Sequence, residues 1–244
     1  MIPKIIHYCW FGRGKKSELI EKCIESWKRF CPDYEIIEWN EDMLDMEANL
    51  YIKQAYEAKK WAFVSDYARL YALYHKGGIY LDTDVEILKP LDEFLDQDSF
   101  TGFEAKDSPV TAVMAAHKEN PIIKMLLDYY DTASFVNEDG SLNMITNTHI
   151  ITEYFVKEGV KLNGKKQTVG GMTIYPQIVF CPNNFSRVFK TPSKKSYTIH
   201  HFDQSWKNEK RQDTFKYRLR RYLVGALRNT VGTDRLESMA KSRK

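Results

Sequence analysis

The order of apolar and polar positions predicts strands and helices that follow one another along the chain. Residues 4–11 form a short apolar and aromatic run, which predicts a buried first strand. Glycines at 12 and 14 end this run, and apolar residues between 19 and 27 then recur at helical spacing, with Ser17 as the N-cap. A second strand is expected at residues 34–39. This succession is typical of a parallel α/β unit.

The middle of the chain continues the pattern with one long helix and one clear strand. Residues 52–75 have helical spacing, and the Gly77-Gly78 pair ends the helix as a C-cap. In residues 79–88 apolar side chains alternate with Asp82, Asp84 and Glu86, which predicts a half-buried strand. Further strands are expected at 99–103, 110–116, 173–181 and 197–202, and further helices at 121–130, 145–156 and 215–229.

Composition indicates an ordinary folded domain. The 244 residues are 43% hydrophobic and 28% charged, which suits one domain with a substantial core. No window approaches the roughly 18 apolar residues of a membrane span, and no apolar signal stretch precedes the first strand. The four cysteines form no C-x-x-C pair, so we expect reduced thiols in a cytoplasmic protein.

Charge is distributed unevenly along the chain. Residues 207–244 contain 12 Lys or Arg and 4 Asp or Glu, a net charge of +8, whereas the remainder carries −5. Apolar residues of the expected helix at 215–229 fall on one face. A basic amphipathic helix is expected to dock on anionic lipid at the inner face of the cell membrane. A solvated tail fits the charge equally well, and no recognised nucleic-acid motif precedes the segment.

Asp82-Thr83-Asp84 is the first candidate for chemistry. Two carboxylates one residue apart on an extended segment point to the same side of the chain, here at the carboxyl end of an apolar strand. Their mutual repulsion favours a divalent cation, and oxygen ligands suit magnesium or manganese. A D-x-D on a solvated strand is the alternative, which the G-G-I-Y-L-D-T-D context disfavours.

Three further places carry candidate side chains. Asp66 and Arg69 share a helix face, either as a local ion pair or as contacts to sugar and phosphate. His200 and His201 face opposite sides of an expected strand, so one of them is available to a given metal site. Trp10 ends the first strand, where it is either a core residue or a stacking surface for a nucleobase.

Four segments resemble glycosyltransferase family 32, the D-x-D group that includes bacterial capsule and lipopolysaccharide enzymes. They are I-P-K-I-I-H-Y-C-W-F-G from residue 2, S-D-Y-A-R-L-Y-A-L-Y from residue 65, G-G-I-Y-L-D-T-D from residue 77, and H-H-F-D-Q-S-W from residue 200. The same segments are distantly similar to the clostridial glucosylating toxins. Family members often have a T-G-P-like stretch on the acceptor side, for which Thr146-Asn147-Thr148 is the nearest match here.

The resemblance implies a GT-A fold, an α/β Rossmann-like sandwich with a central mixed sheet, over residues 1–206, followed by a basic helical extension at 207–244. It also implies Mn²⁺ or Mg²⁺, a nucleotide-sugar donor and retention of anomeric configuration. Carried over by position, it assigns Asp82, Asp84 and His201 to the metal, Asp66 and Arg69 to catalysis with the two carboxylates, and Trp10, Asn40, Ser65, Tyr80, Ser205 and Trp206 to the donor.

The expected function is therefore transfer of a hexose from a nucleotide-sugar, UDP-sugar favoured, to a polysaccharide or a lipid-linked oligosaccharide in surface polysaccharide biosynthesis. Two alternatives remain open from the sequence. A haloacid-dehalogenase-like phosphatase also uses D-x-D after a strand, although Glu86 stands here where that signature has Thr or Val. A non-catalytic protein could instead bind an anionic surface or nucleic acid through its basic segment.

Overall fold

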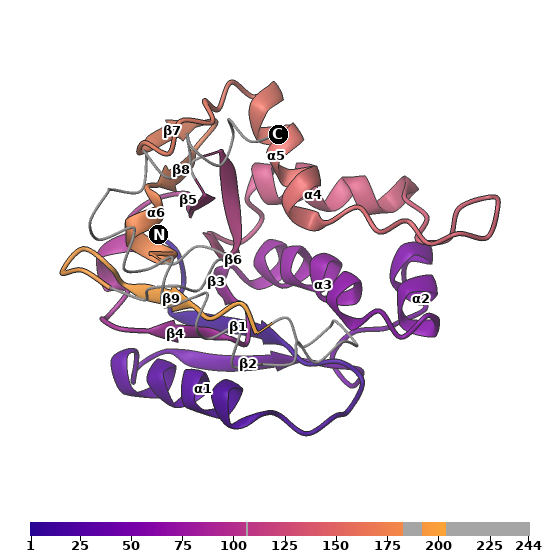
Figure 1. Ribbon diagram of the computed structural model, residues 1–244, viewed down its shortest axis with the longest axis horizontal. Coiled ribbons are helices and arrows are strands. Elements are labelled where there is room, and N and C mark those ends of the chain that lie inside the picture. The colour runs from indigo at the N-terminus through magenta and orange to yellow at the C-terminus, as the bar shows by residue number, and fades with distance from the viewer. Residues whose placement is uncertain (106, 183–191, 204–244) are drawn as a thin grey trace, which may run out of the picture.

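The computed structural model describes residues 1–105, 107–182 and 192–203, which form a layered α/β domain (Figure 1). Its elements are β1 (Ile5–Cys9), α1 (Glu18–Phe30), β2 (Glu35–Trp39), α2 (Leu50–Glu57), α3 (Trp61–Lys76), β3 (Gly78–Leu81), β4 (Val85–Ile87), the 3-10 turn η1 (Asp92–Phe94), β5 (Ser99–Ala105), β6 (Ser108–Ala116), α4 (Pro121–Thr132), α5 (Asn147–Lys157), β7 (Gln167–Val169), β8 (Met172–Tyr175), α6 (Gln177–Phe180) and β9 (Thr198–His200). The predicted helix at 215–229 and the boundary at 206 lie outside the described residues.

A seven-stranded mixed sheet, in the order β2-β1-β3-β6-β5-β8-β7, forms the centre of the domain. β1 pairs in parallel with β2 and β3, and β5 with β8, while β6 runs antiparallel to both of its neighbours. A small second sheet joins β4 to β9. The expected mixed α/β sandwich is confirmed, including the opening β1-α1-β2 unit.

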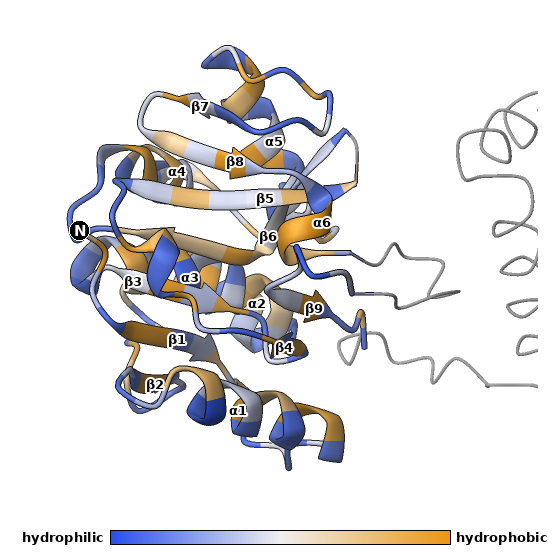
Figure 2. Cartoon of the chain, turned by 90° about the vertical axis from the view of Figure 1, so that its left-hand side faces the viewer, coloured by the Kyte–Doolittle hydropathy of each residue, from blue (hydrophilic) through white to orange (hydrophobic). Residues whose placement is uncertain are grey.

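Strand alternation divides the core into two layers, one on each face of the sheet. Ile79 and Leu81 of β3 pack on the side of α1, whereas Tyr80 between them packs on the side of α2 to α5. Figure 2 shows that α1 turns hydrophilic residues away from the sheet. None of the helices in the described part of the chain has the length and apolar character that a membrane crossing needs.

The strand predicted at residues 79–88 is broken in two, at the D-x-D motif. β3 ends at Leu81, and β4 begins at Val85 and leaves the main sheet to pair with β9. A hydrogen bond of 3.0 Å from Val85 N–H to Asp82 O closes a tight turn, while Asp82 N–H donates to Ala112 O. The expectation of an extended segment was therefore wrong, because the chain turns where the two acids stand.

The helix predicted at 52–75 is also two helices. α2 ends in a Schellman arrangement, with Lys60 N–H donating to Ala55 O and Lys59 N–H to Tyr56 O. Lys59 occupies the left-handed position at φ 56°, where glycine is usual, so the sequence contains no signal for this break. The strand predicted at 173–181 likewise stops at Tyr175, and α6 begins after Pro176.

The Gly77-Gly78 pair ends α3 and begins β3, which follows directly in the sheet. Gly77 is the C-cap at φ 68°, and a Cβ there would lie 2.6 Å from Lys118 N. The Gly77 carbonyl accepts a hydrogen bond of 2.6 Å from Nε2 of the buried His7. Trp39 Nε1–H donates to Nδ1 of the same ring at 3.1 Å, so His7 is neutral and joins β1, β2 and the end of α3.

Candidate active site

The D-x-D turn lies in the lining of a cavity of about 580 Å³ at the carboxyl ends of β1 and β3. The Asp84 side chain is almost fully buried, and its Oδ2 accepts a hydrogen bond of 2.7 Å from Asp203 N–H. Burial alone would raise the pKa of Asp84, but His200 and the Asp203 N–H lower it to about 2. Asp84 is therefore a carboxylate throughout the physiological range.

His200 joins the two acids because β9 pairs with β4. The register places His200 opposite Val85, and its Nε2 lies 3.3 Å from Asp84 Oδ1. One ligand atom each of Asp82, Asp84 and His200 lies within 4.8 Å of the others. Two carboxylates and an imidazole are a donor set suited to manganese or another divalent first-row metal, so the residues fit the implied cation.

His201, which the resemblance assigned to the metal, lies apart from this group. His201 Nε2 lies 2.9 Å from Glu86 Oε2, and its N–H donates to the Asp84 carbonyl. Neighbouring residues of a strand point to opposite sides, so His201 faces away from the carboxylate pair that His200 contacts. The sequence argument left one of the two histidines for the metal, and in the structure it is His200 that lies beside the two acids.

A buried arginine connects the D-x-D turn to α3. The Arg69 Nη2 lies 2.9 Å from Asp66 Oδ1 and 3.4 Å from Asp82 Oδ1, and Arg69 Nε–H donates to Ser65 O. The guanidinium also lies over the Tyr80 ring, 4.6 Å from its centroid. Arg69 is only 6% exposed, so this is a buried bridge between two elements rather than a surface ion pair.

The Tyr80 side chain contacts Asp82, the first acid of the D-x-D motif. Its hydroxyl donates a hydrogen bond of 2.9 Å to Asp82 Oδ1, and its ring is buried between α3 and the sheet. Burial raises the pKa of Tyr80 well above its usual value, which keeps the hydroxyl protonated as a donor. The family resemblance assigned Tyr80 to the donor site. In the structure Tyr80 lines the cavity, with its ring against the Arg69 guanidinium.

The comparisons with known proteins bear on this same part of the chain. Residues 17–101 match the family described as "Glycosyltransferase sugar-binding region containing DXD motif". The matched segment contains Asp66, Arg69, Tyr80 and the D-x-D turn. This part of the chain is therefore similar to the sugar-binding region of DXD glycosyltransferases. Trp10, His200 and α5 lie outside the matched range, so their place beside the DXD turn is known from the structure alone.

Two curated relatives and one solved structure are similar to parts of this chain. Inositol phosphoceramide mannosyltransferases 3 and 1 of Schizosaccharomyces pombe are 32% and 30% identical over 129 and 110 residues, which is 50% and 41% of this chain. The chain spans about a third of their length, 35% and 33%. The structure titled "PaToxG Glycosyltransferase" superposes with a TM-score of 0.51 at 20% identity, covering 65% of this chain and 70% of that one, which shows a shared GT-A fold.

Asp66 is the DXD-site carboxylate with the most altered acidity. Burial raises the pKa of Asp66 to about 7, against the lowering that Arg69 and the Asn147 backbone N–H provide. The Asn147 N–H belongs to the first turn of α5, which therefore points its N-terminus at Asp66. Asp66 is consequently poised between its two protonation states near neutral pH.

Asn147 lines the cavity. In the sequence it belongs to Thr146-Asn147-Thr148, the nearest match to the T-G-P-like stretch of the family. It is 3% exposed, and its Nδ2 donates a hydrogen bond of 2.8 Å to Tyr130 Oη. Its Oδ1 is buried and has no hydrogen-bond partner among the residues that the structure describes. A buried acceptor left open at a cavity wall is expected to accept a hydrogen bond from a ligand hydroxyl.

Two tryptophans, Trp10 and Trp61, also line the cavity. Trp10 is partly exposed, and its Nε1–H donates to Gly14 O at 2.7 Å. Trp61, at the start of α3, was not predicted as a site residue. A Cβ on Gly12 would lie 2.6 Å from the Trp61 ring, so the glycine allows the loop after β1 to pass directly against this indole.

Of three other predicted residues, one lies outside the cavity lining and two fall outside the residues that the structure describes. Asn40 donates to Glu38 at 3.2 Å and accepts from Asp42 N–H, and it is not part of the described cavity lining. It organises the turn after β2, which is a structural task. Ser205 and Trp206 lie outside the described residues, so their expected place over the diphosphate stays a prediction.

Glu104 is the second residue that the sequence missed. It stands near the end of β5, is 9% exposed and lines the cavity. Its Oε1 lies 3.5 Å from Nδ1 of His200. A single glutamate in a strand has no motif around it, so nothing in the sequence could associate it with the DXD turn.

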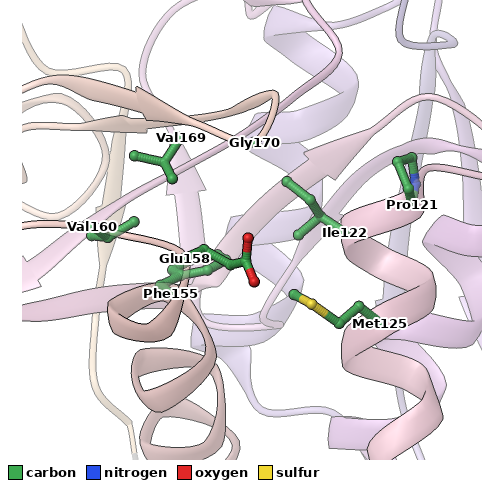
Figure 3. Close-up of a pocket in the computed structure, with 8 residues that line it drawn as sticks. All are labelled: Pro121, Ile122, Met125, Phe155, Glu158, Val160, Val169 and Gly170. Atoms are coloured by element: carbon green, nitrogen blue, oxygen red, sulfur yellow. The ribbon is translucent and has the colours of Figure 1, made fainter.

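A smaller cavity of about 210 Å³ lies between α4, α5 and the β7-β8 hairpin (Figure 3). Its lining is mainly apolar, including Ile122, Met125 and Val169, with the carboxylate of Glu158 as its one ionisable side chain. None of the predicted site residues lines it. One acid in an apolar wall supplies no pair of groups for catalysis or metal binding, so the larger cavity is the candidate active site.

Proposed function

We propose that this chain is a metal-dependent glycosyltransferase that moves a hexose from a nucleotide-sugar, UDP-sugar favoured, to a glycan acceptor with retention of configuration. The single observation that carries the proposal is the cavity in which the Asp82–Asp84–His200 group and the buried Arg69 lie together. The DXD family match over residues 17–101 supports the same assignment. A phosphatase is not favoured, because the match is to a sugar-binding region.

Asp82, Asp84 and His200 would hold the divalent cation, which when bound supplies positive charge to the donor diphosphate. The remaining work falls to side chains of the chain itself. Arg69 is held under the turn by two carboxylates, so its position is fixed before a donor arrives. A preorganised guanidinium next to a phosphate stabilises charge that develops there as the sugar–phosphate bond breaks.

Asp66 and Asn147 are proposed to position the sugar. Asp66 has acceptor oxygens and Asn147 a free buried acceptor, so both suit hydroxyl donors of a hexose ring. Trp10 is proposed to stack on the nucleobase. In a front-face transfer the departing phosphate oxygen takes the proton of the acceptor hydroxyl, so the chain needs no separate carboxylate base.

We also propose which sugar donors and acceptors to test. The two relatives of Schizosaccharomyces pombe are named as mannosyltransferases that act on an inositol phosphoceramide, so GDP-mannose and a lipid-linked acceptor belong in any screen. A growing surface polysaccharide on a lipid carrier remains our preferred acceptor. The basic segment at 207–244 would bring the enzyme to the inner face of the membrane, where such carriers are found.

The test is a thermal-shift screen of UDP- and GDP-sugars with and without Mn²⁺, followed by transfer assays with the stabilising donor. A cognate donor is expected to raise the melting temperature only in the presence of metal. Product NMR then reports the anomeric configuration, with Asp84→Asn as the inactive control. If no nucleotide-sugar stabilises or reacts, while simple phosphoesters are hydrolysed, the proposal falls in favour of a phosphatase.

A further inference from the structure

The His200 imidazole is held on both sides by carboxylates. Its Nε2 lies 3.3 Å from Asp84 Oδ1 and its Nδ1 lies 3.5 Å from Glu104 Oε1. The Glu104 side chain is about nine-tenths buried, and the Phe202 ring lies 4.0 Å from the imidazole, centroid to centroid. The ring therefore has little freedom to rotate out of this arrangement.

From this geometry we infer that Glu104 is a positioning residue, which holds His200 in the orientation and tautomer that metal ligation by Nε2 requires. The inference rests on the proposed metal-dependent function. A neutral imidazole has one protonated and one free nitrogen, and only the free one can bind a cation. With a cation at Nε2, the Glu104 carboxylate, 3.5 Å from Nδ1, would favour the remaining proton on Nδ1 and so direct the Nε2 lone pair toward the group with Asp82 and Asp84.

Glu104 reaches the site from a different part of the fold than the ligands do. Asp82 and Asp84 come from the β3-β4 turn and His200 from β9, whereas Glu104 comes from β5 of the central sheet. The Gln177 side chain of α6 donates a hydrogen bond of 2.7 Å to the Glu104 carbonyl, which anchors the backbone next to this side chain. A residue of the seven-stranded sheet, Glu104, thus contacts Nδ1 of His200, which belongs to the two-stranded sheet.

The chain provides its own control for this inference. Glu86 Oε2 lies 2.9 Å from His201 Nε2, so a second glutamate–histidine pair stands beside the small sheet and outside the metal group. Removing Glu86 takes away the same kind of contact without touching His200. A loss that is specific to Glu104 would therefore report on the metal site rather than on charge or on the small sheet in general.

The experiment measures Mn²⁺ binding directly, from the EPR signal of free Mn²⁺, with no donor present. Glu104→Ala is expected to weaken binding about 10- to 100-fold, and Glu104→Gln less, because its amide oxygen can still accept from Nδ1–H. Glu86→Ala should bind as the wild type does. In a double-mutant cycle, Glu104→Ala should add little to His200→Ala, since the first acts through the second.

The outcomes separate this inference from the function on which it rests. If the wild type binds Mn²⁺ and Glu104→Ala binds it equally well, the positioning role is overturned while the metal site stands. If the losses of Glu104→Ala and His200→Ala multiply in the cycle, Glu104 acts independently of His200 and the inference is also overturned. If the wild type binds no Mn²⁺, the metal-dependent function falls as well. Circular dichroism of each variant shows that it is folded.

Discussion

Asp84 of the β3-β4 turn and His200 of β9 face one another, with Oδ1 and Nε2 3.3 Å apart. The pair is buried, and each side chain determines the charge of the other: His200 lowers the pKa of Asp84, and Asp84 raises that of His200 against the effect of burial. A cation that replaces the proton between them would meet two ligands already in contact.

Asp84→Asn is expected to abolish metal binding and sugar transfer while the fold is retained. The amide is isosteric but uncharged, so Mn²⁺ affinity and transfer should fall by more than about 100-fold, since removing a residue that only contacts a metal ligand already costs about 10–100-fold. Metal titration and a transfer assay check this, with Glu86→Gln as a matched carboxylate outside the group. Near-normal transfer by Asp84→Asn would show that the DXD turn does not bind the metal.

Arg69→Met is expected to lower the free energy of unfolding by about 3–5 kcal/mol, because it leaves carboxylates of Asp66 and Asp82 without their buried cation. Urea denaturation measures the loss. The double variant Arg69→Met/Asp66→Asn should recover part of the stability, since one of the two uncompensated charges is removed, but it should remain inactive. Equal stability of Arg69→Met and the wild type would contradict a buried bridge.

His7 is expected to make the stability of the fold depend on pH under acid conditions. Burial lowers its pKa from 6.5 to about 4, partly against the hydrogen bond to the Gly77 carbonyl. Between these values the unfolded chain binds more protons than the folded one, so stability is fully present above pH 6.5 and is lost as the pH falls to 4. The loss should approach about 3 kcal/mol, at 1.36 kcal/mol per pKa unit.

Urea denaturation at several pH values tests the role of His7. The variant His7→Gln does not titrate and can still donate to the Gly77 carbonyl, so the part of the pH dependence due to His7 should vanish in it. An unchanged slope between pH 4 and 6.5 in His7→Gln would assign the effect to other groups.

Gly12→Ala is expected to destabilise the loop after β1 and to disturb the tryptophan end of the cavity. The position has φ +88°, and the new Cβ would lie 2.6 Å from the Trp61 ring, which together should cost about 1–3 kcal/mol. Gly14→Ala is the matched control, because no heavy atom lies within 4 Å of a Cβ there. Urea denaturation and quenching of tryptophan fluorescence by UDP compare the two variants. Equal behaviour of both would show that Gly12 and Trp61 are not packed as described.

Much of the fold could be predicted because it depends on local periodicity. The first βαβ unit, the N-cap at Ser17 and the helix stop at Gly77 follow from apolar spacing and from residues with special backbone properties. The two errors in the middle of the chain have a common cause. Lys59 adopts a left-handed conformation that is usual for glycine, and the DXD segment turns within a run that alternates like a strand. Neither break therefore contains a residue type from which it could be predicted.

By itself the sequence determined the chemical types at the site: the two acids of the DXD turn, the Asp66–Arg69 pair on one helix face, and a choice between two histidines. Only the tertiary structure decided that His200 rather than His201 joins the acids, and that Glu104 and Asn147 line the same cavity. The physical reason is that strand pairing between β4 and β9 fixes which side of the chain faces the acids. That register depends on contacts between distant segments, which no local pattern of residues records.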